Sequence, residues 1–487
     1  MKKIKTIGFF LLLCCTLLQY SCNEDMTGTP IDNPEIEPTE DGFAIDVGNS
    51  TIPYLVINTD GEQIQNEPKI PAEMTIYVGK EEVQRQTIGI EFRGSTSFRV
   101  SNKKSYGIET WDEAGNDVNV SFFDFPEEED WILTGQIAGD DFINDRTLMY
   151  HYFGYNLFRK MGRYASRCKF VEVEINGSYE GVYVFMEKLK RNKNRIPIAK
   201  LQAEDTDAES ITGGYILKID KTGGEFGEGQ PLSYFQNNWE DDARYTAQNS
   251  FRSRYDINGE VISFNAYDPP YHDNQYLETY FQYEYPDKED ITNEQKTYIQ
   301  DYIHAFETAL LSDDFSTENR TYPDFIDVTS FVDFFIINEV CRNVDGYRLS
   351  TYMYKDRGDK LNMGPIWDLN IGYDSGDRVP ANDWVINYNN FVERDPWMMP
   401  FWWPRLLEDP QFKTALKERW TNLRAGVLAT SELERMVDSA AKELLDNGSI
   451  ERNNLRWFDY DYNAATASLK SYLEQRTAWM DGEISRF

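Results

Sequence analysis

The chain has 487 residues, of which 40% are hydrophobic and 15% aromatic, and its formal net charge is −34 at pH 7. This content of apolar side chains is enough for a large folded core and excludes a chain that is disordered throughout. The acidic balance excludes nucleic acid as a partner, because a surface of this sign repels the phosphate backbone.

The start of the chain has the pattern of an export signal. Lysines at positions 2, 3 and 5 precede the apolar stretch 7–18, which has the length of a signal-peptide core and is short for a membrane-spanning helix. Cys22 follows Ser21 where a bacterial lipoprotein is cut and acylated. We therefore expect residues 1–22 to be a lipoprotein signal peptide, with lipid on Cys22 holding the exported protein on the membrane of the cell envelope, at the outer membrane or cell surface. The alternative is an ordinary secretory signal with an incidental cysteine.

Residues 23–42 are rich in Pro, Glu, Asp and Thr and predict a flexible acidic tether. From Phe43 onward, apolar and polar residues alternate between turn residues, a pattern that is typical of β-strands. The stretch from Gly94 to Asn102 is expected to be a polar loop at the tip of a hairpin. The strands predicted around it are 51–57, 73–78, 88–93 and 105–110.

The middle of the chain combines one predicted helix with further strands. Asp145 opens a helical pattern that runs to about Lys160. Asn176-Gly177 lies between two alternating strands, and this dipeptide is among the strongest short-range signals for a β-hairpin. The two strands of this hairpin are 171–175 and 181–186, a further strand is expected at 213–220, and residues 223–286 are expected to be irregular.

The last third of the chain is mainly helical by its pattern. Thr292 followed three residues later by Gln295 predicts a capped helix, and Ser431 with Glu434 has the same spacing. The order of elements predicts an α+β fold with a sheet-rich N-terminal half and a mostly helical C-terminal half. The helices expected here are 292–311, 327–340, 431–446 and 464–485, with a hairpin of 351–355 and 361–366 between them.

The remaining cysteines and the histidines bear on whether the chain holds a disulfide or a zinc ion. Cys168 and Cys341 either pair in an oxidising compartment or are core thiols. The histidines have no zinc-ligand spacing, which makes a zinc enzyme an unfavourable interpretation; they are His151, His272 and His304.

Two groups of residues are candidates for handling phosphate. The small-residue tip at 93–98 would expose backbone N–H groups and hydroxyls to phosphate oxygens, and Lys103 or Lys104 would add a positive charge. Further on, Asp345 ends a polar cluster, and Asp368 and Asn370 stand two residues apart, on one side of an extended chain. Together these oxygens would suit Mg²⁺. The alternative is that both groups only form and cap turns.

Taken in order, these segments resemble the spore coat protein H (CotH) kinase family over most of the chain, from about Phe43 to Phe487. The resemblance rests on short motifs, namely Arg93–Ser97 with Lys103–Tyr106, Asn144–Arg146, Val173–Tyr183 with Glu187, Gly213–Tyr215, and Asn338–Glu339 with Asp345 and Trp367–Asp368. It implies an atypical protein kinase of two lobes, which uses ATP and Mg²⁺ or Mn²⁺ and has a protein hydroxyl as the acceptor.

The resemblance also implies roles for single residues. Asp345 would face the acceptor hydroxyl, and Asp368 would bind the metal. Lys104, or less favourably Lys103, would contact the phosphates, which Arg93 and Ser95 would help to cover. Glu187 would either pair with the lysine or belong to the link between the lobes, and Trp367 would stack on adenine.

One position departs from the family pattern. Where the family commonly has a second acid, this chain has Asn370, which supplies no charge, so Asp374 is a candidate substitute. The function implied is therefore transfer of phosphate from ATP to a Ser or Thr hydroxyl of a protein, or of this chain itself. The alternative is an inactive kinase-like surface scaffold or adhesin that binds protein or glycan. The boundaries expected within 43–487 are a sheet-rich lobe to about 220, an insertion over 221–290 and a helical lobe over 291–487.

Overall fold

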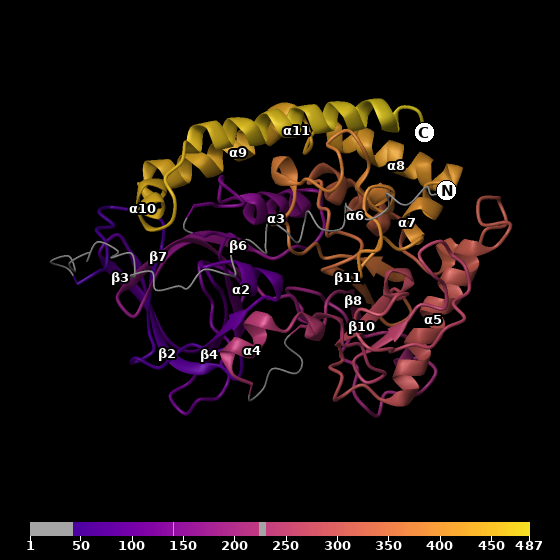
Figure 1. The fold of residues 1–487 in the computed structure, drawn as a ribbon, viewed down its shortest axis with the longest axis horizontal. Coiled ribbons are helices and arrows are strands. Elements are labelled where there is room, and N and C mark those ends of the chain that lie inside the picture. The colour runs from indigo at the N-terminus through magenta and orange to yellow at the C-terminus, as the bar shows by residue number, and fades with distance from the viewer. Residues whose placement is uncertain (1–41, 140, 224–229) are drawn as a thin grey trace, which may run out of the picture. The chain divides into compact units, whose positions relative to one another are not determined.

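The computed structural model describes residues 42–139, 141–223 and 230–487. The predicted signal peptide, Cys22 and nearly all of the predicted tether lie outside these residues. Within them, Val47 to Phe487 form one folded unit that begins with a sheet-rich part and ends in helices (Figure 1), so the predicted α+β class is confirmed. No helix in this part of the chain is long and apolar enough to cross a membrane.

The first sheet is a closed barrel with the strand order β1-β2-β3-β4-β5-β7-β6. Its strands pair antiparallel except where β1 meets β6 in parallel, with Tyr54 opposite Glu172. Asn176 and Gly177 have φ angles of 50° and 78° and turn β6 into β7, which confirms the predicted hairpin. The barrel strands are β1 Tyr54–Asn58, β2 Ile70–Val78, β3 Glu81–Arg93, β4 Ser105–Trp111, β5 Asp130–Thr134, β6 Cys168–Ile175 and β7 Ser178–Glu187.

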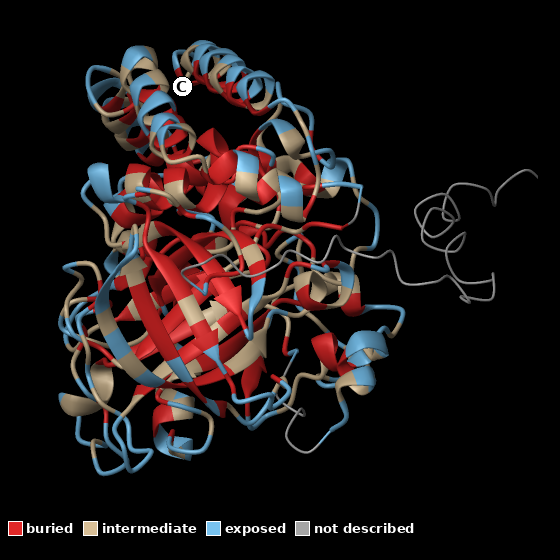
Figure 2. Ribbon diagram, turned by 90° about the vertical axis from the view of Figure 1, so that its left-hand side faces the viewer, coloured by how far each residue is buried: buried red, intermediate tan, exposed pale blue. Residues whose placement is uncertain are grey.

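Apolar side chains fill the barrel. In β4 the buried positions alternate with more exposed ones, as the two-residue period of a strand requires. Inside, the Trp131 ring stacks on Phe185 with centroids 5.3 Å apart, and Phe122 meets the edge of Trp131 at 5.4 Å. Figure 2 shows the strands largely buried and the exposed positions mainly on loops and outer helix faces. Closure of the sheet also leaves the barrel without a free edge.

A second sheet has the strand order β12-β11-β8-β10-β9. The expectation that residues 223–286 are irregular is wrong in part, because β9 and β10 come from this stretch and β10 pairs with β8. Since β8 also pairs with β11, the sheet joins three distant stretches of chain. Its strands are β8 Tyr215–Ile219, β9 Ser250–Arg252, β10 Tyr280–Tyr285, β11 Thr351–Lys355 and β12 Leu361–Met363.

Helices α8, α9 and α11 run along the top of the unit in Figure 1, whereas α5 lies lower, beside the second sheet. The predicted capping box of α5 is confirmed, since the Gln295 N–H donates to Thr292 Oγ1 at 3.3 Å and the Thr292 N–H donates to Gln295 Oε1 at 3.1 Å. The helices are α2 Thr96–Val100, α3 Tyr150–Lys160, α4 Leu232–Asn237, α5 Asn293–Leu311, α6 Val328–Val340, α7 Trp402–Leu406, α8 Pro410–Arg424, α9 Thr430–Asp446, α10 Ser449–Arg456 and α11 Tyr462–Ile484.

Three local predictions are wrong. The expected loop at the hairpin tip contains the short helix α2. Helix α3 begins at Tyr150 rather than Asp145, because Leu148 has a φ of 59° and the Asp145 carboxylate accepts the Tyr150 N–H at 2.8 Å from outside the helix. Helix α9 begins at Thr430 without a side-chain cap, so Ser431 forms no capping box.

Helix α6 is the buried centre of the helical part. Every residue from Ser330 to Val340 is buried, as expected for a helix that is apolar on all sides. Near its end the fully buried Glu339 carboxylate pairs with Arg476 of α11 at 2.8 Å. Glu339 also accepts the N–H groups of Val385 and Ile386, at 2.8 and 3.2 Å. Three segments that are distant in sequence are therefore tied to the end of α6.

The two remaining cysteines form no disulfide. Cys341 is fully buried just after α6 and lies 3.2 Å from the Tyr373 hydroxyl. Burial raises the pKa of its thiol to about 12. The interpretation of Cys341 as a core thiol is confirmed.

Candidate functional site

Three loops meet at one end of the second sheet. They follow β8, α6 and β12, and the register places Thr351 opposite Ile219 at the end of β8. The Ser350 N–H donates to the Asp220 carboxylate, which ties the loop after α6 to the loop after β8. Tyr352 contacts Trp367 with ring centroids 6.2 Å apart, so the loop after β12 lies here too. Asp345 and Asp368, which the sequence predicts as site residues, thus lie on adjoining loops.

Asp220 and Asp368 are close enough to repel each other. Burial raises the pKa of the Asp220 carboxyl, and the nearby Asp368 carboxylate raises it further. Asp368 Oδ1 also lies 3.6 Å from Nε2 of His151, which accepts the Leu369 N–H at 3.2 Å. A divalent cation between two such carboxylates would relieve their repulsion.

The Asp345 carboxylate is held by arginine on one oxygen. Its Oδ1 accepts a hydrogen bond from the buried Arg348 guanidinium at 2.5 Å and lies 4.0 Å from Arg378. Both arginines also face Asp395, at 3.4 and 3.8 Å. Within residues 42–139, 141–223 and 230–487, Oδ2 of Asp345 accepts no hydrogen bond. One carboxylate oxygen is therefore oriented, and the other is available to accept a proton.

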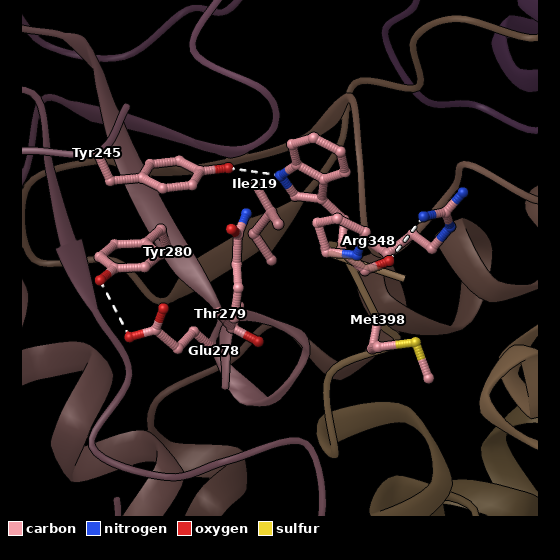
Figure 3. A pocket seen from close by; sticks show the side chains of 10 residues that line it. Ile219, Tyr245, Glu278, Thr279, Tyr280, Arg348 and Met398 are labelled. Atoms are coloured by element: carbon pink, nitrogen blue, oxygen red, sulfur yellow. Dashed lines mark hydrogen bonds between the residues drawn. The ribbon is translucent and has the colours of Figure 1, made fainter. Parts of the chain in front are cut away.

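Arg348 also lines a small cavity of about 10 Å³, with room for about one water molecule. Figure 3 shows Tyr245 and Tyr280 facing Arg348 and Met398 across it. Trp397 links both sides, because its indole donates to the Tyr245 hydroxyl at 2.7 Å and its carbonyl accepts from Arg348 at 2.6 Å. Arg348 is thus held by the Trp397 carbonyl as well as by Asp345.

The two lysines near the hairpin tip lie in different surroundings. Lys104 donates to the carbonyl oxygens of Phe98 and Ser101 at 2.6 and 2.7 Å, and so binds the last turn of α2. Lys103 is buried and donates to the Val182 carbonyl at 2.5 Å and to Gln136 Oε1 at 2.8 Å. Burial lowers the pKa of the Lys103 ammonium to about 7 and also lowers that of Lys104.

The other candidates for covering phosphate divide into two groups. The Arg93 guanidinium lies 5.5 Å from the centroid of the Trp367 ring, which stacks on Tyr155 at 6.1 Å. The Ser95 hydroxyl instead donates to the buried Asp242 carboxylate, which also pairs with Arg99. The structure therefore brings Arg93 to Trp367 and joins Ser95 to the segment that precedes β9.

Glu187 does not pair with Lys104. Its fully buried carboxylate lies 2.7 Å from Arg167, accepts the Arg167 N–H at 2.8 Å and accepts the Tyr164 hydroxyl at 3.1 Å. Arg167 and Tyr164 lie in the connection between α3 and β6, so Glu187 binds that connection to the end of β7. The expected pairing of Glu187 with Lys104 is therefore wrong.

The candidate substitute acid faces another way. Asp374 accepts hydrogen bonds from the hydroxyls of Tyr150 and Ser468, both at 2.6 Å, and so joins α3 to α11. The Asn370 carbonyl accepts the side chain of Asn144. In the described part of the chain, no three or more His, Cys, Asp or Glu side chains are grouped to hold a metal ion. The donor set near Asp368 is therefore a pair of carboxylates.

Backbone strain is concentrated around these loops. Non-glycine residues with positive φ include Tyr347 at 71°, Ser350 at 48° and Asp368 at 50°. Such conformations cost of order 1–3 kcal/mol each and persist where the surrounding packing imposes them. Their density near Asp345 and Asp368 is typical of a functional site.

Two residues of the site were not predicted from the sequence. Asp220 is the acid that ends the apolar β8 pattern, and an acid at a strand end was the available signal. Arg348 was missed because its position is fixed by the Trp397 carbonyl, 49 residues further along the chain, and the short-range pairing with Asp345 gave no recognised pattern.

Comparison with known proteins identifies one family. A family model described as CotH kinase protein matches residues 90–480. No curated protein matches the chain.

We expect replacement of Lys103 by methionine to change how stability depends on pH. The folded state binds Lys103's proton less tightly than the unfolded state, so this lysine makes stability rise with pH above about 7. At about 1.4 kcal/mol per pH unit for one proton, the rise between pH 7 and 9 is about 2 kcal/mol. Urea unfolding of the parent and Lys103→Met at both pH values measures it, and equal slopes would contradict the assignment.

Proposed function

The chain belongs to the CotH kinase protein family, and on this basis we propose that it transfers phosphate from ATP to a serine or threonine hydroxyl of a protein or of this chain itself. The observation that carries the proposal is the pairing of two acidic features on adjoining loops. One is Asp345, oriented by Arg348 with one free oxygen, and the other is the Asp220–Asp368 pair.

In this proposal Asp345 is the residue that faces the acceptor. Arg348 holds Oδ1, so Oδ2 is left to take the hydroxyl proton as the acceptor oxygen bonds to the γ-phosphorus and the bond from that phosphorus to the leaving ADP oxygen breaks. Phosphoryl transfer depends mainly on positioning and charge neutralisation, which suits a site whose strongest feature is a fixed carboxylate.

Asp220 and Asp368 are the residues that would hold Mg²⁺ or Mn²⁺. Magnesium commonly takes one or two protein carboxylates and fills its other positions with water and substrate phosphate, so a pair of carboxylates fits it. The bound metal would supply neutralisation of the phosphate charge. Asn370 is two residues from Asp368 and remains a candidate amide ligand, whereas both Asp374 oxygens are occupied by hydroxyl donors.

The nucleotide would lie near Arg93 and Trp367, which contact each other. Arg93 then offers a planar guanidinium to phosphate oxygens, and the Trp367 ring offers a surface for adenine. Lys104 reaches phosphate only by leaving the carbonyl oxygens at the end of α2. We therefore propose Arg93 as the principal cation of the phosphate site.

A second candidate function is a kinase-like scaffold without activity. The observation that favours it is the occupation of two assigned phosphate contacts by protein groups. The Lys104 ammonium binds backbone carbonyls, and the Ser95 hydroxyl binds Asp242. In a scaffold these contacts would simply stabilise the hairpin tip.

We also propose that the protein is exported and held on the cell envelope by lipid on Cys22. The proposal rests on the positive residues, apolar stretch and cysteine at the start of the sequence. Lipid attachment would place the proposed kinase outside the cytoplasm, where ATP is scarce. Its acceptor would then be another exported protein or the chain itself, because these are the proteins present at that location.

Incubation of the protein with ATP and Mg²⁺ or Mn²⁺ is expected to add phosphate mass. Asp345→Asn keeps the size of the side chain but removes the proton acceptor, and should slow the reaction by about a hundredfold or more. Intact-mass spectrometry with time measures the rate. Asp313→Asn, an exposed acid on a distant loop, is the matched control. No phosphate transfer and no ATP binding by calorimetry in either metal would favour the scaffold.

Asp220→Asn is expected to weaken binding of Mn²⁺ in the presence of ATP by at least about tenfold, because one of the two carboxylate ligands is lost. Electron paramagnetic resonance of free Mn²⁺ measures this without any turnover. Asp368→Asn should have the same effect and Asp313→Asn none. Unchanged binding in Asp220→Asn would exclude Asp220 as a ligand.

Cells that express the full chain are expected to attach a labelled fatty acid to it. Cys22→Ser should lose the label and move the protein from the membrane fraction to the soluble fraction. Label retained in Cys22→Ser would place the lipid elsewhere, and an unlabelled parent protein would indicate an ordinary secretory signal.

A further inference from the structure

A groove lies between the end of α9, helix α10 and the start of α11. Its volume is about 500 Å³, which is within the range of ligand sites. Its lining includes Leu445, Ile450, Glu451, Leu455, Asp459 and Tyr460. The proposed phosphate-transfer residues lie elsewhere, on the loops after β8, α6 and β12.

The groove presents an unpacked aliphatic side chain. Leu455 is 81% exposed, the highest exposure among the large hydrophobic side chains in the described part of the protein. It lies on α10, whose opposite face is packed against β7. A single exposed leucine is common, but this one lines a hollow together with Leu445 and Ile450. Covering Leu455 would therefore extend an apolar floor that already exists.

The rim of the groove is acidic. It carries Glu451, Asp459 and Asp461, and no lysine, arginine or histidine lines it. Across residues 42–139, 141–223 and 230–487, none of these three carboxylates forms an ion pair. Asp461 uses one oxygen to cap α11, where it accepts the Ala464 N–H at 2.9 Å. The rim therefore offers three carboxylates that form no ion pair within the described residues.

The groove is held in place by the barrel. Asn453 of α10 accepts the Val182 N–H at 3.1 Å, and Arg452 pairs with the buried Glu172 of β6. The Trp457 indole donates to the Glu180 carbonyl at 2.9 Å. These contacts fix the inner face of α10. A partner that binds the outer face, which carries Glu451 and Leu455, therefore does not have to order this helix.

We propose that this groove binds a basic segment of a partner protein in which a lysine or arginine is next to an aliphatic residue. The aliphatic side chain lies on Leu455, Leu445 and Ile450, and the cationic group lies between Glu451 and Asp459 and donates to their carboxylate oxygens. An acidic segment is repelled by the same rim, and this selectivity is the reason for assigning a basic partner.

The test is binding of a short fluorescent peptide of alternating leucine and lysine to the full protein, followed by fluorescence anisotropy without nucleotide. The expected result is binding that weakens as salt is added, and no binding of the peptide with glutamate in place of lysine. Leu455→Ser should weaken binding about tenfold, since most of a leucine contact is lost. The double change Glu451→Gln with Asp459→Asn should weaken it by a similar factor, about tenfold, and reduce the salt dependence.

Matched controls distinguish binding in the groove from non-specific attraction to the acidic surface of the protein. Val261→Ser removes another exposed aliphatic side chain, and Glu418→Gln removes an exposed acid on α8, and neither should alter binding. All substituted positions are exposed, and thermal unfolding checks that folding is retained. Hydrogen exchange should show peptide-dependent protection within 445–463.

Two outcomes would overturn the proposal. These are no binding of the basic peptide, and equal affinity in the groove variants and the parent. Because no nucleotide is present, failure here leaves the proposed kinase activity untouched, and failure of phosphate transfer leaves this binding result intact.

Discussion

The buried pair of Glu339 and Arg476 is the contact on which the helical part depends. Both side chains are fully inaccessible, and breaking one partner of such a pair typically costs 3–5 kcal/mol because a charge is left unpaired. Arg476 also donates to the carbonyl oxygens of Glu339, Ala381 and Asp383, at 2.7–2.8 Å. The end of α6, the segment before Val385 and helix α11 are therefore positioned together, and the loop that carries Asp345 starts from this fixed point.

The same principle joins the barrel to the helices. The buried Glu172 of β6 pairs with Arg452 of α10, and the Lys103 ammonium donates a hydrogen bond to Asn453 Oδ1 at 3.3 Å. A buried charge is costly unless it is paired and hydrogen-bonded, so these groups hold α10 in one orientation against β7. Helix α10 is thus a rigid element with one face committed to the barrel and one face free. Two separate buried ion pairs therefore position α10 beside the groove and the end of α6 before the Asp345 loop.

Local chemistry predicted the elements that it determines alone. The Asn176-Gly177 turn is specified by two residues that tolerate positive φ, and the cap of α5 by Thr292 and Gln295. Strand β9 was missed because its three residues are too few to show a period, and it forms only by pairing with β10. The capping pattern at Ser431 was misleading, since the chain enters α9 one residue earlier and the serine lies inside the helix.

The sequence by itself determined the acidic charge, the export pattern, the α+β class and the set of polar residues from which a kinase-like site is drawn. The tertiary structure alone decided how those residues are shared between function and support. It placed Asp220 near Asp368 and paired Glu187 with Arg167. It also made Asp374 the acceptor of hydrogen bonds from the Tyr150 and Ser468 hydroxyls. The physical reason is that a carboxylate's role depends on which cation or donor reaches it, and most of these partners lie far away along the chain.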